Sequence, residues 1–209
     1  MDLIDLGALD ACELQTDPFD YIVVPDFLPP ENLKRVNADY PAIDTATNHD
    51  LRHLAYGPQF AKFISELQTD TFRMHLGKKF GVDLSGCPTT TTVRKFCERT
   101  DGHIHTDHKS KVITVLVYFN DEEWNTDGGC LRILRSSSSL EDYTAEVKPL
   151  GGRLLAFHRT DWSWHGHKKF VGERRMLQYN FLSSSKLAQL DQKISRVGTH
   201  IGKRVLGLR

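Results

Sequence analysis

The chain has 209 residues, of which 39% are hydrophobic and 26% charged, and this ordinary globular composition fits one domain, residues 1–209, with a sizeable core. Lys plus Arg and Asp plus Glu both number 27, so the net charge is zero, which argues against a general nucleic-acid binder with its basic excess. The four cysteines form no Cys-x-x-Cys pair, which indicates reduced thiols in a cytoplasmic protein. The first residues carry no basic segment before a long apolar run, so we expect neither a signal peptide nor a membrane span.

The N-terminal part of the chain predicts a strand followed by helices. Residues 21–24 are aromatic and β-branched, which is typical of a strand. Pro30 and the acidic residue after it predict the start of a helix over residues 31–39. Apolar residues then recur at helical spacing over residues 60–80, with a break near Thr69 that indicates two helices. We therefore expect residues 1–88 to support one face of a sheet.

The middle of the chain is rich in strands. Residues 89–96 are mostly Thr and Val, and turns containing Gly-Gly pairs separate several of the later runs. These later strand-like runs are residues 112–119, 130–135, 153–157 and 174–182. Many strands with helices at one end predict a mainly β protein with supporting helices (α+β), with a double-stranded β-helix, or jelly-roll, core over residues 89–182.

The C-terminal residues 183–209 predict an amphipathic helix with a basic face. Its apolar positions are spaced 3, 4, 3 and 4 residues apart, namely Leu187, Leu190, Ile194, Val197 and Ile201. Three arrangements stay open for this helix: docking on the core, a seam between two copies of the chain, or contact with an anionic surface or membrane interface. Oligomerisation through residues 183–209 is thus one of the predictions.

A possible metal site begins at His105 and Asp107. On an extended chain, two residues two apart project from the same face, so these side chains can take neighbouring positions around one metal. A second histidine would complete a 2-His-1-carboxylate set, which leaves open positions as Fe(II) oxygenases require. His165 is our candidate, and Arg174 follows it by nine residues on the last strand-like run. The planar fork of an arginine suits a carboxylate co-substrate.

Residues 92–182 resemble the catalytic core of the iron(II)/2-oxoglutarate dioxygenases, on the prolyl-hydroxylase side and most similar to the oxygen-sensing prolyl hydroxylases. The resemblance extends beyond the His-x-Asp pair. It is carried by Tyr118-Phe-Asn120, Trp124, Gly128-Gly129-Cys-Leu131-Arg-Ile-Leu134, Gly152-Arg-Leu-Leu-Ala-Phe157, and His165 with Arg174. The resemblance implies the jelly-roll fold and an oxygenase activity.

The resemblance also implies a ligand set and cofactors. His105, Asp107 and His165 correspond to the iron ligands. Fe(II), 2-oxoglutarate as co-substrate and O2 are the expected cofactors, with ascorbate as a further candidate. Arg174 and Tyr118 correspond to residues that hold the distal carboxylate of 2-oxoglutarate.

Thr114 lies on the same strand face as Tyr118, so we expect it to assist in binding 2-oxoglutarate. The family often has a tyrosine near the iron where this chain has Phe96, and Arg94 is a candidate to replace that hydroxyl.

Two histidines compete with the chosen ligands. His103 is a rival to His105, but only His105 has an Asp two residues later. His167 is a rival to His165, but the interval from His165 to Arg174 matches the family.

The last strand distinguishes Arg174 from Arg175 by alternation. Arg174 shares a face with Met176, Gln178 and Asn180. The opposite face carries Arg175, Leu177, Tyr179 and Phe181, and this mostly apolar set predicts packing against the helices. We therefore expect Arg174 to point into the barrel.

The resulting hypothesis is a hydroxylase that oxidises a C–H bond while 2-oxoglutarate loses CO2 to give succinate. The carboxylate of Asp107 favours hydroxylation over halogenation, because the related halogenases lack this ligand. The substrate is expected to be a prolyl or other peptidyl residue or a small molecule. Two alternatives remain: a non-catalytic jelly-roll that binds a partner or senses a metabolite, and a zinc hydrolase with the same ligands.

Overall fold

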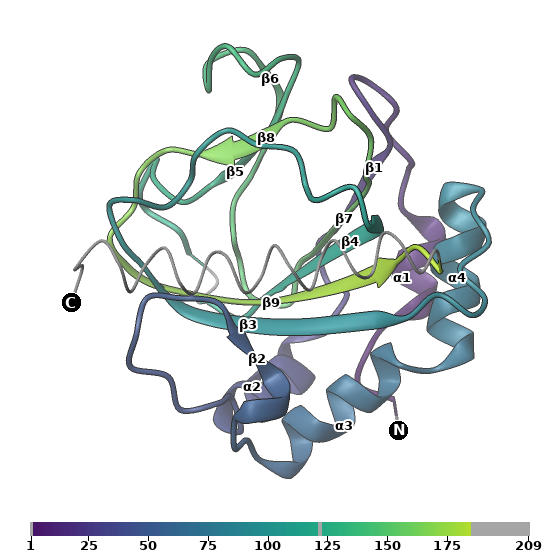
Figure 1. The fold of residues 1–209 in the computed structure, drawn as a ribbon. Helices are drawn as coiled ribbons and strands as arrows, with labels where there is room; N and C mark the ends of the chain where they lie inside the picture. Colours follow the sequence, from purple (N-terminus) through teal and green to yellow (C-terminus); the bar gives the residue numbers. More distant parts are fainter. Residues whose placement is uncertain (1, 121–122, 185–209) are drawn as a thin grey trace.

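The computed structural model describes residues 2–120 and 123–184, which form two antiparallel sheets and a set of helices (Figure 1). The predicted tail helix lies outside the described residues from residue 185 onward, so that prediction and the oligomer that depends on it stay untested.

The larger sheet has six strands in the order β1-β7-β4-β9-β3-β2. Their bounds are β1 Tyr21–Val24, β7 Leu154–His158, β4 Lys111–Tyr118, β9 Gly172–Leu182, β3 Thr89–Cys97 and β2 His49–Asp50. The smaller sheet has the order β6-β5-β8, with β6 Tyr143–Val147, β5 Leu131–Leu134 and β8 His165–His167. Figure 1 shows the smaller sheet on the opposite side of the larger sheet from the helices. The predicted jelly-roll with supporting helices is confirmed.

The helices form for reasons visible in the sequence. They are α1 Leu6–Ala11, α2 Pro30–Ala38, α3 Pro58–Leu67 and α4 Asp70–Phe80, together with the 3-10 turn Leu51–His53. Both α2 and α3 start with proline, whose fixed φ and missing N–H suit a first helical position. The hydroxyl of Thr69 accepts a hydrogen bond from the backbone N–H of Phe72 and caps α4, which confirms the predicted break between two helices.

Two hydrophobic cores lie on the two faces of the large sheet. The first joins the sheet to the helices: Leu177 and Phe181 of β9 are buried there, and the ring of Tyr179 lies 6.4 Å from that of Phe72. The second lies between the sheets and includes Leu116 of β4 and Ile133 of β5. The predicted alternation on β9 is therefore correct.

Arg174 is 2% exposed and Asn180 is 3% exposed, and both lie on the face of β9 opposite its apolar residues. This face looks into the space between the sheets. Strands β6 and β8 were not predicted, because β6 has an exposed polar pattern and β8 has only three residues, two of them histidines. None of the helices in the described residues is long and apolar enough to cross a membrane.

Candidate metal and co-substrate site

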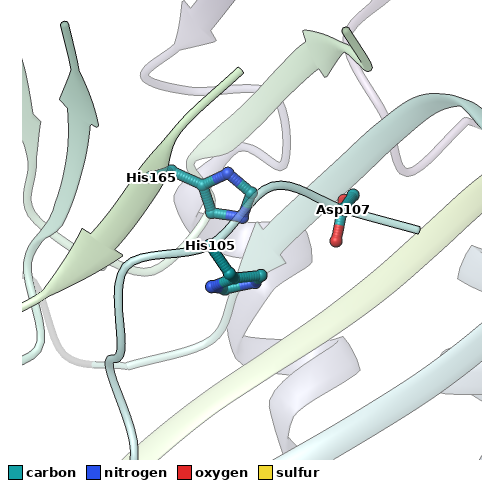
Figure 2. Close-up of side chains that lie close together, drawn as sticks. All are labelled: His105, Asp107 and His165. Carbon is teal, nitrogen blue, oxygen red and sulfur yellow. The ribbon is translucent and has the colours of Figure 1, made fainter. Parts of the chain in front are cut away.

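Three side chains converge where the loop before β4 crosses β8 (Figure 2). The backbone N–H of His105 donates to the carbonyl of His165 at 3.0 Å, and the N–H of His165 donates back to the carbonyl of His105 at 3.0 Å. This bridge holds the imidazole centroids 4.4 Å apart. Potential ligand atoms of His105, Asp107 and His165 all lie within 4.8 Å of one another, which is close enough for one metal ion. The structure thus brings together the three residues that the sequence predicted as metal ligands.

The hydrogen bonds of the two histidines leave one nitrogen of each ring available. The Nδ1 atom of His105 lies 2.8 Å from the carbonyl of His103, and Nδ1 of His165 lies 2.9 Å from the carbonyl of Ser163. A carbonyl can only accept, so Nδ1–H is the donor in both rings and Nε2 keeps its lone pair. Burial lowers the pKa of His165 to about 4, so its imidazole is neutral at pH 7, the form that binds metals.

The carboxylate of Asp107 is buried and has a partner on each oxygen. The hydroxyl of Thr114 donates to Oδ2 at 2.5 Å, and Nζ of Lys111 lies 2.9 Å from Oδ1. Burial alone would raise the pKa of Asp107, but Lys111, His165 and Thr114 together bring that pKa well below its usual value. The carboxylate is therefore ionised at neutral pH. Thr114 thus contacts this carboxylate, and its expected contact with the co-substrate stays a prediction.

Arg174 and Tyr118 form a buried polar corner. Nε of Arg174 donates to the carbonyl of Gly129 at 2.8 Å, and Nη1 lies 3.1 Å from Sδ of Met176. The guanidinium carbon lies 5.2 Å from the ring centroid of Tyr118. Within the described structure, Nη2 of Arg174 and the hydroxyl of Tyr118 are buried without a hydrogen-bond partner.

Buried donors without partners destabilise a protein, so we expect an acceptor to bind beside Arg174 and Tyr118. A carboxylate fits, because it accepts from both a guanidinium and a phenol. Gly129 permits this arrangement: its φ is +78°, and a Cβ there would lie 3.3 Å from Cδ of Arg174. The residues present therefore fit the distal carboxylate of 2-oxoglutarate, and the two imidazoles with one carboxylate fit Fe(II).

The neighbouring arginines are engaged elsewhere. Arg175 pairs with Glu173, and its guanidinium carbon lies 5.8 Å from the ring centroid of Tyr40, on the helix side of the sheet. Arg94 bonds the carboxylate of Asp101 at 2.7 Å and two backbone carbonyls, and a β-bulge separates it from Phe96. Arg94 is thus held in its own network, and the guess that it replaces a tyrosine hydroxyl at Phe96 gains no support.

The rival histidines lie outside the three-residue group. His103 is exposed, and its carbonyl serves as the acceptor for His105. His167 is 8% exposed, with its Nδ1 2.8 Å from the carbonyl of Lys168. Burial lowers the pKa of His167 to about 4.

Lys111 is the site residue that sequence reasoning missed. Strict alternation from Thr114 would turn it to the opposite face of the strand. The pairing of β4 with β9 shifts between Lys111 and Ile113, and such a bulge re-aims the residue beside it. The side chain of Lys111 is therefore only 11% exposed and reaches Asp107.

Comparison with known proteins also points to Fe(II) and 2-oxoglutarate. Residues 92–182 match the family described as the 2OG-Fe(II) oxygenase superfamily. No curated protein matches the chain.

Solved structures share the fold at low sequence identity. A Pseudomonas putida prolyl-4-hydroxylase is 15% identical with a TM-score of 0.58, covering 86% of this chain and 94% of its own. The viral collagen prolyl hydroxylase of Paramecium Bursaria Chlorella virus-1, in complex with 2OG, is 15% identical with a TM-score of 0.54, covering 79% of this chain and 96% of its own. A 2OG-Fe(II) oxygenase family oxidoreductase from Burkholderia pseudomallei is 14% identical with a TM-score of 0.53, covering 85% and 90%.

The matched region contains the converging His105, Asp107 and His165 and the corner of Tyr118 and Arg174. Enzymes of this family use Fe(II), 2-oxoglutarate and O2. Residues 92–182 thus match the 2OG-Fe(II) oxygenase superfamily, and the described part of the chain shares the jelly-roll fold of the similar structures.

Proposed function

We propose that His105, Asp107 and His165 bind Fe(II) and that Arg174 and Tyr118 hold the distal carboxylate of 2-oxoglutarate. The observation that carries this assignment is the pair of buried, unpartnered donors on Arg174 and Tyr118, which lie in the same inter-sheet space as the three-residue group. A metal site alone would not need a buried arginine with a free N–H.

Each residue of the site has a separate task. When bound, Fe(II), 2-oxoglutarate and O2 supply the oxidation, in which 2-oxoglutarate gives succinate and CO2 and a substrate C–H bond is hydroxylated. Asp107 supplies the anionic ligand, and Thr114 fixes the orientation of its carboxylate. The carbonyls of His103 and Ser163 set the tautomers of the two histidines. Arg174 and Tyr118 orient 2-oxoglutarate by holding its distal carboxylate.

We propose a prolyl or other peptidyl residue, or a related small molecule, as the substrate. The support is that two of the similar structures are described as prolyl hydroxylases, one of them of collagen. We also propose a cytoplasmic location, which rests on the four cysteines, all of them free thiols in the structure.

The test is succinate production from 2-oxoglutarate by protein loaded anaerobically with Fe(II) and then exposed to O2. We expect slow, substrate-independent turnover in the wild type, lost in Asp107→Ala and kept in Asp127→Ala, which removes an exposed carboxylate. Turnover retained in Asp107→Ala would contradict the ligand assignment.

A zinc hydrolase and a non-catalytic binding protein are the competing functions. Zinc accepts the same ligands, but zinc hydrolysis gives no role to Arg174. Activity with zinc and without 2-oxoglutarate would favour the hydrolase. Full iron loading with 2-oxoglutarate binding but no turnover with any substrate would favour the binding protein.

A further inference from the structure

The ammonium group of Lys111 lies inside the proposed metal site. It forms an ion pair with Oδ1 of Asp107 at 2.9 Å, while Oδ2 of the same carboxylate accepts from Thr114 at 2.5 Å. Both oxygens of the anionic ligand are therefore occupied in the metal-free protein. A metal that binds Asp107 has to share or replace one of these partners.

The partner on Oδ1 is easier to replace than the partner on Oδ2. Thr114 sits in the middle of β4, and its hydroxyl also lies 3.2 Å from the side-chain amide oxygen of Asn180. Lys111 reaches Asp107 through a flexible four-carbon chain. Oδ1 is therefore the oxygen that a metal can take, and a dication there repels the ammonium group.

Once displaced, Lys111 needs another anion. Among the described residues, Asp107 is the carboxylate that pairs with Lys111. The side chain of Lys111 is only 11% exposed. A cation that is largely removed from water is unstable without a counter-ion. The charge balance agrees: the metal dication, Asp107, the two carboxylates of 2-oxoglutarate and Arg174 sum to zero, so Lys111 leaves one uncompensated positive charge.

The position of Lys111 on its strand indicates which molecule carries that anion. Along β4, Tyr118 pairs with Met176 at the end near Arg174, Thr114 pairs with Asn180 in the middle, and Lys111 pairs with Leu182 at the other end. Tyr118 and Arg174 mark the co-substrate end, and Thr114 marks the position of Asp107. Lys111 therefore lies at the end of β4 away from the proposed co-substrate anchor, so the distal carboxylate of 2-oxoglutarate does not reach it and the substrate is the remaining candidate for its partner.

We infer that Lys111 is a specificity residue: it neutralises Asp107 in the metal-free site and, after the metal binds, recognises a carboxylate on the substrate. This inference rests on the function proposed above. The carboxylate can belong to a free amino acid or to an acidic residue beside the oxidised one in a peptide. Both sources present the same chemistry, and the experiment separates them.

The first arm measures metal binding by calorimetry with Mn(II), which binds such sites without reacting with O2. We expect Lys111→Met to bind Mn(II) about tenfold more tightly than the wild type, because the competing ammonium is gone. Lys62→Met is the matched control, since Lys62 pairs with Glu66 across the same i,i+4 interval at 3.8 Å but on α3. Equal or weaker Mn(II) binding by Lys111→Met would contradict the counter-ion role.

The second arm measures substrate binding to the protein saturated with Mn(II) and 2-oxoglutarate. The probes are proline against prolinamide, and N-acetyl-Pro-Asp-amide against N-acetyl-Pro-Asn-amide. We expect at least one acid to bind about tenfold more tightly than its amide in the wild type, a preference lost in Lys111→Met and restored in Lys111→Arg. The pair that shows the preference identifies the source of the carboxylate.

Three results of the second arm would overturn the substrate-recognition role: no acid preference in the wild type, including no binding of either acid; a preference that survives in Lys111→Met; or weaker binding of 2-oxoglutarate alone in that variant. Failure of the proposed metal and co-substrate assignment is distinguishable from these results, because the wild-type protein would then fail to bind Mn(II) or fail to bind 2-oxoglutarate before any substrate is added.

Discussion

Replacing Thr114 with valine tests the role that the structure gives this residue. Valine keeps the shape of threonine and removes the hydroxyl that donates to Asp107 Oδ2 at 2.5 Å. Thr114 is fully buried, so water cannot supply a substitute donor. A hydrogen bond to a charged group contributes about 1.5–3 kcal/mol, and we expect the free energy of unfolding of the metal-free protein to fall by that amount.

The same substitution affects the metal site. Partners that orient a metal ligand typically contribute about 10–100-fold to metal affinity, so Thr114→Val should weaken Mn(II) binding within that range. Thr114→Ser keeps the hydroxyl and should bind Mn(II) as the wild type does. The assays are urea unfolding of the metal-free protein and calorimetric Mn(II) titration. Wild-type Mn(II) affinity in Thr114→Val, with weaker 2-oxoglutarate binding at saturating Mn(II), would refute this role and restore Thr114 as a co-substrate contact.

Two further substitutions test other parts of the site. Tyr118→Phe should weaken 2-oxoglutarate binding to the Mn(II)-loaded protein about tenfold or more. The free energy of unfolding should stay equal or rise, because the substitution removes a buried hydroxyl that has no partner among the described residues. A clear loss of stability would show that the hydroxyl has a structural partner. Gly102→Ala should destabilise the protein by at least about 2 kcal/mol in urea unfolding, because φ is +90° and the new Cβ would lie 2.3 Å from the carbonyl oxygen of His167. Gly81→Ala, at φ +65° with open space around it, should cost only about 1 kcal/mol, and equal effects at both glycines would contradict the close packing over β8.

Local patterns predicted the parts of the fold that follow from local chemistry. The Pro-led start of α2, the cap at Thr69 and the alternation on β9 are encoded within a few residues each, and all three are present in the structure. The short strands β6 and β8 were missed because their pairing with β5, and not their own composition, makes them strands.

The site was predictable only as far as regular strand geometry holds. His105, Asp107 and His165 were proposed from spacing and resemblance, and the structure brings them together. Lys111 escaped because a β-bulge reverses the face that alternation assigns to it. The contact of Thr114 with Asp107 escaped because it depends on where the loop before β4 returns to the sheet, which no local pattern encodes.

The most direct test of the account is anaerobic titration of the Fe(II)-loaded protein with 2-oxoglutarate, followed by the visible charge-transfer absorption of a 2-oxo acid chelated to Fe(II). We expect the band to appear in the wild type, to require at least about tenfold more 2-oxoglutarate in Arg174→Ala, and to be absent in Asp107→Ala. A wild-type protein that holds a full complement of iron and shows no band would contradict the assignment of this site to 2-oxoglutarate.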